Sequence, residues 1–162
     1  MHINDRLQKL YDIITSSSFI NSRGLGNEVN FHVFDYEPEN EYLVRDYMKY
    51  LIDKKELNIK EFNIYDIIVD ILKEKGFLEK VFEFEKNKGT KYVNKIIEKT
   101  LGISSNSDLI VNHIKKNIKD DQIIIISGIG SCWPIIRGHT ILNNLQSVIT
   151  KNPLIMLYPG QY

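Results

Sequence analysis

Residues 123–139 read IIIISGIGSCWPIIRGH, a continuous apolar run that passes into a glycine-containing turn. Four consecutive isoleucines are typical of a strand in a parallel sheet that helices cover on both faces. We therefore predict that residues 123–126 form a central strand and that all four side chains are buried, alternating between the two faces. A helix is expected after the turn, around residues 140–150.

Outward from this run, strands and helices alternate along the chain. Further strands are predicted at residues 29–36, 56–65 and 153–160 from their apolar and β-branched composition. Helices are predicted at residues 4–14, with Asn4 as the N-cap, and at 39–55 and 65–76. The charge-rich stretch 77–119 predicts two or three more amphipathic helices, with breaks at Gly89 and Gly102.

The helix predicted at residues 39–55 carries apolar side chains at helical spacing, which predict a buried stripe of Leu43, Tyr47, Tyr50 and Leu51. The alternation as a whole predicts an α/β fold. We expect one three-layer domain over residues 1–162, with a mainly parallel sheet of about four strands flanked by helices. The junction of strand, turn and helix that begins at residue 123 is expected to have a P-loop-like shape, although it lacks a Walker A motif.

Composition limits the function classes. The 162 residues hold 21 basic and 21 acidic side chains, so no general field attracts a polyanion. The balance argues against direct nucleic-acid binding, and any such contact would need a local patch. The single cysteine, Cys132, excludes an internal disulfide and fits a reducing cytoplasm. No apolar run is long enough to span a membrane, and a soluble cytoplasmic protein is expected.

The glycine turns lack the residues that grip phosphate. A Walker A loop needs GxxxxGK[ST], and neither the lysine nor the hydroxyl follows Gly128 or Gly26. Gly128 and Gly130 match the first two glycines of a dinucleotide-binding GxGxxG, but Trp133 takes the third position. Pro134 also restricts Trp133 away from the helical region. Glycines chosen for a tight turn account for the pattern better than a nucleotide site does.

Catalytic and metal patterns are weak as well. Cys132 has no base near it in the sequence, which argues against a nucleophile. The four histidines form no HxxxH or HExxH pair, so no metal is predicted. Asn143 and Asn144 could orient a ligand or pair with a neighbouring loop.

Three stretches of the sequence together resemble the BrxB family of BREX bacteriophage-exclusion systems. They are RGLGNEVNFHVFDYEP near the start, GIGSCWPIIRGHTILNNLQ, and PLIMLYPGQY. Pro134, Arg137 and His139 match a proline, arginine, small residue, histidine pattern of the family. Gly138 stands where a serine is more familiar in that pattern. Family members tend to continue beyond the PGxY motif, whereas this sequence stops at Tyr162, so a shortened form is expected.

The resemblance implies a non-enzymatic component of an anti-phage defence system, without a cofactor. Its expected role is partner binding or scaffolding. The first expected partner is a PglZ-like protein of the alkaline-phosphatase superfamily, and an AAA+ ATPase and a DNA methyltransferase are further candidates. The alternative is a degenerate nucleotide- or nucleic-acid-binding protein of the same complex.

Two glycine turns are the expected partner-binding segments, since open α/β sheets carry their working loops at strand ends. The candidate residues are Arg23, Gly24, Gly26 and Glu28 in the first turn, and Trp133, Arg137 and His139 in the second. Tryptophan and arginine are enriched at binding hot spots. The structural alternatives are that Trp133 fills the core and that Arg137 and His139 hold the turn through backbone carbonyls.

Overall fold

The computed structural model describes residues 2–21, 30–103 and 105–162. The chain forms two compact units. Unit 1 comprises Met1–Phe62, Ile118–Ser127 and Ile149–Tyr162, and unit 2 comprises Asn63–Asn117 and Gly128–Val148. The prediction that residues 1–162 form a single domain stays a prediction.

Unit 1 is built on a parallel sheet. Its strands are β1 (Phe31–Tyr36), β2 (Ile59–Asn63), β3 (Ile123–Ser127) and β4 (Leu154–Pro159). They lie in the order β1-β4-β3-β2, so the two strands that come last in the sequence occupy the centre. The predicted class, a three-layer α/β fold with a mainly parallel sheet of about four strands, is confirmed, and all four strands are parallel.

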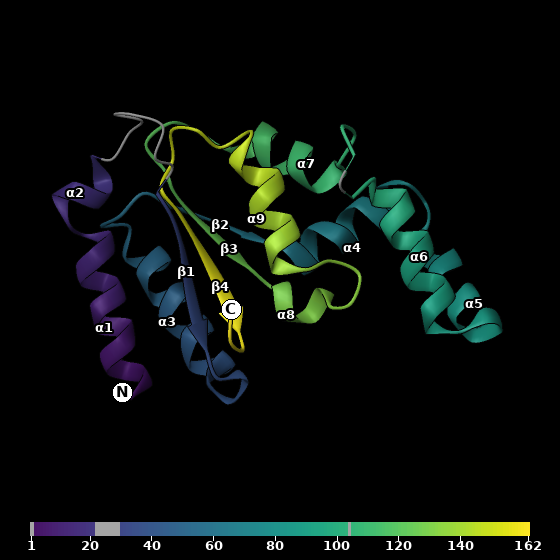
Figure 1. Ribbon diagram of the computed structural model, residues 1–162, viewed down its shortest axis with the longest axis horizontal. Coiled ribbons are helices and arrows are strands. Elements are labelled where there is room, and N and C mark those ends of the chain that lie inside the picture. The colour runs from purple at the N-terminus through teal and green to yellow at the C-terminus, as the bar shows by residue number, and fades with distance from the viewer. Residues whose placement is uncertain (1, 22–29, 104) are drawn as a thin grey trace. The chain divides into compact units, whose positions relative to one another are not determined.

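Helices of unit 1 cover one face of this sheet (Figure 1). They are α1 (Ile3–Ile14), the short α2 (Ser17–Ile20) and α3 (Glu41–Lys54), which follows the 3-10 turn η1 (Pro38–Asn40). Ile123 and Ile125 join the core that α1 and α3 form on that face. Ile124 and Ile126 are also fully buried, so the prediction that both faces of β3 are buried is confirmed.

In unit 1 the predicted N-cap of the first helix is wrong, and the predicted buried stripe of α3 is only partly correct. The N-cap of α1 lies two residues earlier than expected. It is His2, whose Nδ1 accepts a hydrogen bond from the backbone N–H of Asn4 at 3.3 Å. On α3 the fully buried residues are Val44, Met48 and Leu51, so Leu51 is buried as predicted, and the partly buried Tyr47 also packs against the core. Leu43 and Tyr50 were wrongly predicted to be buried and are 45% and 50% exposed. The helix α3 thus has two adjacent apolar stripes. The stripe that contains the tyrosines faces outward, because there their hydroxyl groups stay in water.

Unit 2 consists of helices. The described ones are α4 (Ile64–Glu74), α5 (Leu78–Lys88), α6 (Thr90–Leu101), α7 (Leu109–Asn117), α8 (Ile129–Cys132) and α9 (Gly138–Gln146). Three of them, α5 to α7, fall in the stretch where two or three were predicted. Gly89 and Gly102 adopt positive φ angles of 85° and 65° between these helices, which confirms the predicted breaks.

Buried polar side chains fix the ends of several elements. One oxygen of Asp108 accepts from the backbone N–H groups of Ile110 and Val111 at the start of α7, and the other accepts from Nδ2 of Asn144 on α9 at 3.0 Å. Asn144 therefore pairs with a neighbouring loop, one of the two alternatives that the sequence left open. In unit 1, Asn152 donates to the carbonyl oxygens of Lys119 and Gln122, both at 2.9 Å.

Within the described residues, no helix has the length and apolar character that crossing a membrane requires.

Candidate functional site

The turn after β3 is shaped by close packing against the start of α4. Gly128 has a φ of +75°, and a Cβ at this position would lie 2.1 Å from Oδ1 of Asn63. Asn63 is the N-cap of α4, where the same oxygen accepts from the backbone N–H of Asp66 at 3.3 Å. The space that a phosphate-binding loop would leave open beside its glycine is therefore filled by a side chain. This geometry favours the structural role of the glycine.

Trp133 lies on the surface beyond this turn. The short helix α8 ends at Cys132, and Trp133 is extended, as Pro134 predicts, with a cis peptide bond between the two residues. The indole side chain is 71% exposed, so the alternative that Trp133 fills the core is wrong. Buried Ile129 and Ile136 flank the exposed segment and anchor it at both ends.

Arg137 and His139 follow at the start of α9. Arg137 is the N-cap residue, and its carbonyl oxygen accepts from the backbone N–H groups of Thr140 and Ile141 at 3.0 and 3.2 Å. Its side chain makes no capping hydrogen bond and is exposed, as is the side chain of His139. The backbone of Arg137 thus holds the turn while its guanidinium group faces solvent. We call residues 133–139 the tryptophan turn.

The first glycine turn cannot be compared with the tryptophan turn. Arg23, Gly24, Gly26 and Glu28 lie outside the described residues. Their expected role in partner binding stays a prediction.

Cys132 is unsuited to nucleophilic chemistry in this environment. Its side chain is 1% exposed, and Sγ donates to the carbonyl oxygen of Gly128 at 3.2 Å. Burial, with a smaller contribution from the carboxylate of Asp66, raises the pKa of the thiol to about 12. The reactive form of cysteine is the thiolate, which is therefore scarce at neutral pH.

Alkylation of Cys132 is consequently expected to be slow in the folded protein. At pH 8 we expect iodoacetamide to modify the native chain at least about a hundredfold more slowly than the chain unfolded in urea, where the thiol pKa returns to about 8.5. Intact mass reports this directly, because the sequence has a single cysteine. The native rate should rise steadily above pH 9. A native rate equal to the unfolded rate would contradict the buried, protonated thiol.

A polar pair beside the turn was not predicted from the sequence. The hydroxyl of Ser127, the last residue of β3, is buried and donates to Oε1 of Glu61 on β2. Serine after an apolar strand and glutamate in a different strand give no joint signal in the sequence, because only the strand order brings them together. The pair ties the last residue of β3 to the middle of the neighbouring strand β2.

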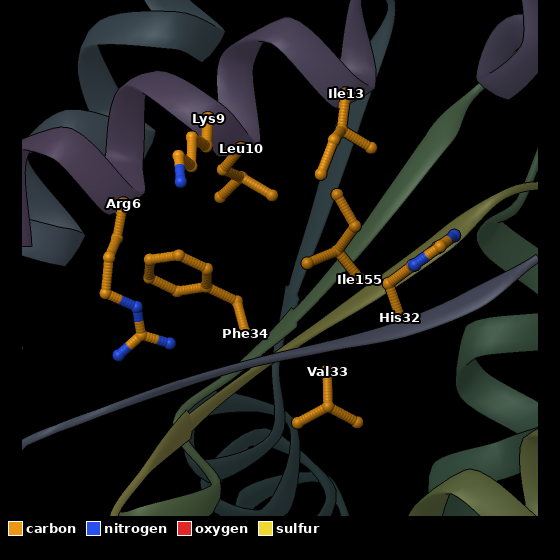
Figure 2. Close-up of a pocket in the computed structure, with 8 residues that line it drawn as sticks. All are labelled: Arg6, Lys9, Leu10, Ile13, His32, Val33, Phe34 and Ile155. Atoms are coloured by element: carbon orange, nitrogen blue, oxygen red, sulfur yellow. The ribbon is translucent and has the colours of Figure 1, made fainter. Parts of the chain in front are cut away.

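A small cavity lies between α1 and β1, as Figure 2 shows. Its volume is about 200 Å³, and its walls are mainly apolar. Arg6 lines the cavity and pairs with Asp35, with 2.7 Å between Nη2 and Oδ1, and its guanidinium carbon lies 5.1 Å from the centre of the Phe34 ring. Ligand pockets usually measure about 300–1,000 Å³, so this cavity is too small for a nucleotide. The ion pair between Arg6 and Asp35 links α1 to β1.

Metal-ligating side chains do not converge in the part of the chain that the structure describes. No group of three or more His, Cys, Asp and Glu side chains there is placed to hold an ion.

Comparisons with known proteins identify the family. The profile described as "BREX protein BrxB" matches residues 60–162 of this chain. A BREX protein BrxB of Bacillus cereus is 40% identical over 164 residues, which cover 99% of this chain and 85% of that protein. A BREX protein BrxB of Escherichia coli is 35% identical over 159 residues, with 97% and 78% covered. No solved structure matches. The chain therefore belongs to the BrxB family.

Proposed function

We propose that this chain acts in its BREX system as a non-enzymatic partner-binding or scaffold protein, and that its first partner is a PglZ-like protein of the alkaline-phosphatase superfamily. Membership of the BrxB family makes the chain a component of a BREX anti-phage defence system. An AAA+ ATPase and a DNA methyltransferase of the same system are further candidate partners.

The observation that carries the proposal is the exposure of Trp133. A tryptophan left 71% exposed gains nothing from the core of its own chain, and large aromatic side chains of this kind dominate binding energies at protein interfaces. Arg137 lies four residues further along the same turn with its side chain in solvent. Buried neighbours hold the turn, so little conformational entropy is lost when a partner covers it.

The nucleotide-binding alternative receives no support from the geometry. Asn63 occupies the space beside Gly128, and the sequence around the turn has no lysine and hydroxyl for phosphate and magnesium. Partner binding is therefore the stronger proposal.

Substitutions in the tryptophan turn test the proposed partner binding. We expect Trp133→Ala and Arg137→Ala each to weaken binding to the PglZ-like protein of the same system by at least about 2 kcal/mol, roughly thirtyfold in dissociation constant. The free energy of unfolding should stay within about 0.5 kcal/mol of the original protein, since neither side chain is buried. Binding is measured by titration calorimetry and stability by urea denaturation.

Phe82→Ala is the matched control. Phe82 is also an exposed aromatic residue of unit 2, at 58%, but lies on α5 outside the turn. The Phe82→Ala variant should bind the PglZ-like partner as tightly as the original protein does. Normal binding by both turn variants, or equal losses in all three variants, would show that the tryptophan turn is not the interface.

A further inference from the structure

A row of lysines occupies the solvent side of α6 and the end of α5. Residues 86–99 hold five lysines against a single acidic residue, Glu98, so this stretch carries +4 within a chain whose net charge is zero. The helices α5 and α6 pack against each other on either side of Gly89 (Figure 1). Positive charge is therefore concentrated in this stretch, although basic and acidic residues balance over the whole chain.

The lysines of α6 form a regular row. Lys91, Lys95 and Lys99 are spaced four residues apart, which places successive Cα atoms about 6 Å apart along the helix axis. All three are exposed. The buried residues of α6 are Val93, Ile97 and Leu101, which lie on the opposite side of the helix. The row thus points away from the core.

Lys88 and Tyr92 extend the row. Nζ of Lys88 lies 4.8 Å from the centre of the Tyr92 ring, and that ring meets Phe84 edge-on with 5.9 Å between ring centres. Tyr92 sits one residue after Lys91 on the exposed side, so Lys88 is held beside the lysines of α6. We define Lys88, Lys91, Lys95 and Lys99 as the lysine ridge.

Helix stability explains only part of the ridge, because Lys88 and Lys99 lie in the last turns of α5 and α6, where the helix dipole favours positive charge. The first turn of α6 has no acidic residue and carries Lys91 instead, although the positive end of the helix dipole favours a negative charge there. Glu85, the acidic group nearest this end in the sequence, accepts a hydrogen bond from the hydroxyl of Thr90 at 3.1 Å. Only Glu98 interrupts the positive charge along the exposed side of α6.

We infer that the lysine ridge docks the phosphate backbone of nucleic acid. A regular row of flexible point charges matches the evenly repeated charges of a phosphodiester chain, whereas carboxylates of a protein partner are better matched by the planar fork of arginine, which the ridge lacks. An exposed tyrosine beside the lysines adds a surface on which a base of single-stranded nucleic acid can stack. Such binding does not read sequence, because phosphate contacts and stacking are available to every base.

Fluorescence anisotropy with labelled DNA tests the inference. We expect the full chain to bind a duplex of about 20 base pairs at about 50 mM salt, with an affinity that falls steeply as salt is added, in line with about four released counterions. Lys91→Gln, Lys95→Gln and Lys99→Gln together should weaken binding about tenfold or more and make the salt dependence shallower by about three counterions. A single-stranded probe and Tyr92→Ala separate stacking from backbone contact.

A second triple variant controls for net charge. Lys49→Gln, Lys73→Gln and Lys116→Gln remove three exposed lysines from other helices and change the net charge by the same amount. This variant should bind DNA like the original protein. The inference is overturned if the original chain does not bind either probe, if both triple variants lose binding equally, or if polyglutamate at equal charge concentration displaces the DNA.

Discussion

Ile125→Asp is expected to unfold the protein. Ile125 is 1% exposed at the centre of β3, pairs in register with Ile155 of β4, and belongs to the core beneath α1 and α3. Losing a buried isoleucine side chain costs about 2–5 kcal/mol, and a carboxylate without a partner at the same place adds the cost of burying its charge. A domain with a total stability of about 5–15 kcal/mol has little left after such a change.

Urea denaturation followed by circular dichroism measures the loss, with size-exclusion chromatography to detect an expanded chain. Ile125→Val keeps most of the volume and should cost only about 0.5–1.5 kcal/mol. Leu43→Asp introduces the same carboxylate on the half-exposed side of α3 and should be mild. A folded Ile125→Asp protein of near-normal stability would mean that one face of the sheet is open to water.

Gly128→Ala is expected to lower the free energy of unfolding by about 2–3 kcal/mol. A non-glycine residue in the left-handed region costs about 1–2 kcal/mol, and the new methyl group must displace the Asn63 side chain, which lies 2.1 Å from its position. Asn63 then loses its capping bond to the N–H of Asp66, worth about 1 kcal/mol.

Two controls divide this cost into its parts. Gly76 has a similar φ of +65° with nothing within 4 Å of its Cβ position, so Gly76→Ala measures the backbone term alone. Asn63→Ala removes the capping side chain. In that background, Gly128→Ala should lower the free energy of unfolding by no more than Gly76→Ala does in the original protein. If the double variant loses as much stability as the two single variants together, the two residues do not interact, which would contradict the close contact between Gly128 and Asn63.

The sequence was sufficient for the fold class because β3 is apolar on both faces, a pattern that few other structures produce. It was insufficient where two solutions had nearly the same pattern. On α3, Leu43, Tyr47 and Tyr50 have the same spacing as Val44, Met48 and Leu51, and only packing against the sheet selects the buried stripe. His2 was missed as a cap because histidine is not among the usual N-cap residues.

The candidate site was partly predictable. Pro134 and the glycines predicted a turn that does not continue directly into a helix. The weak thiol chemistry of Cys132 was predicted because no base lies near it in the sequence. The exposure of Trp133 could not be predicted, because tryptophan occurs both in cores and on interfaces. The lysine ridge was hidden by the overall charge balance, since the compensating carboxylates are spread over the rest of the chain.

The strand order has a consequence for synthesis on the ribosome. The strands β1 and β2 emerge first, yet they occupy the two outer positions and are never neighbours, so they have no partner until β3 and β4 are made. A nascent chain of about 120 residues therefore holds helices and two unpaired strands, and the sheet closes only when the final segment arrives. Chaperone demand and degradation of incomplete chains should accordingly be concentrated late in translation, because exposed strands of this kind aggregate.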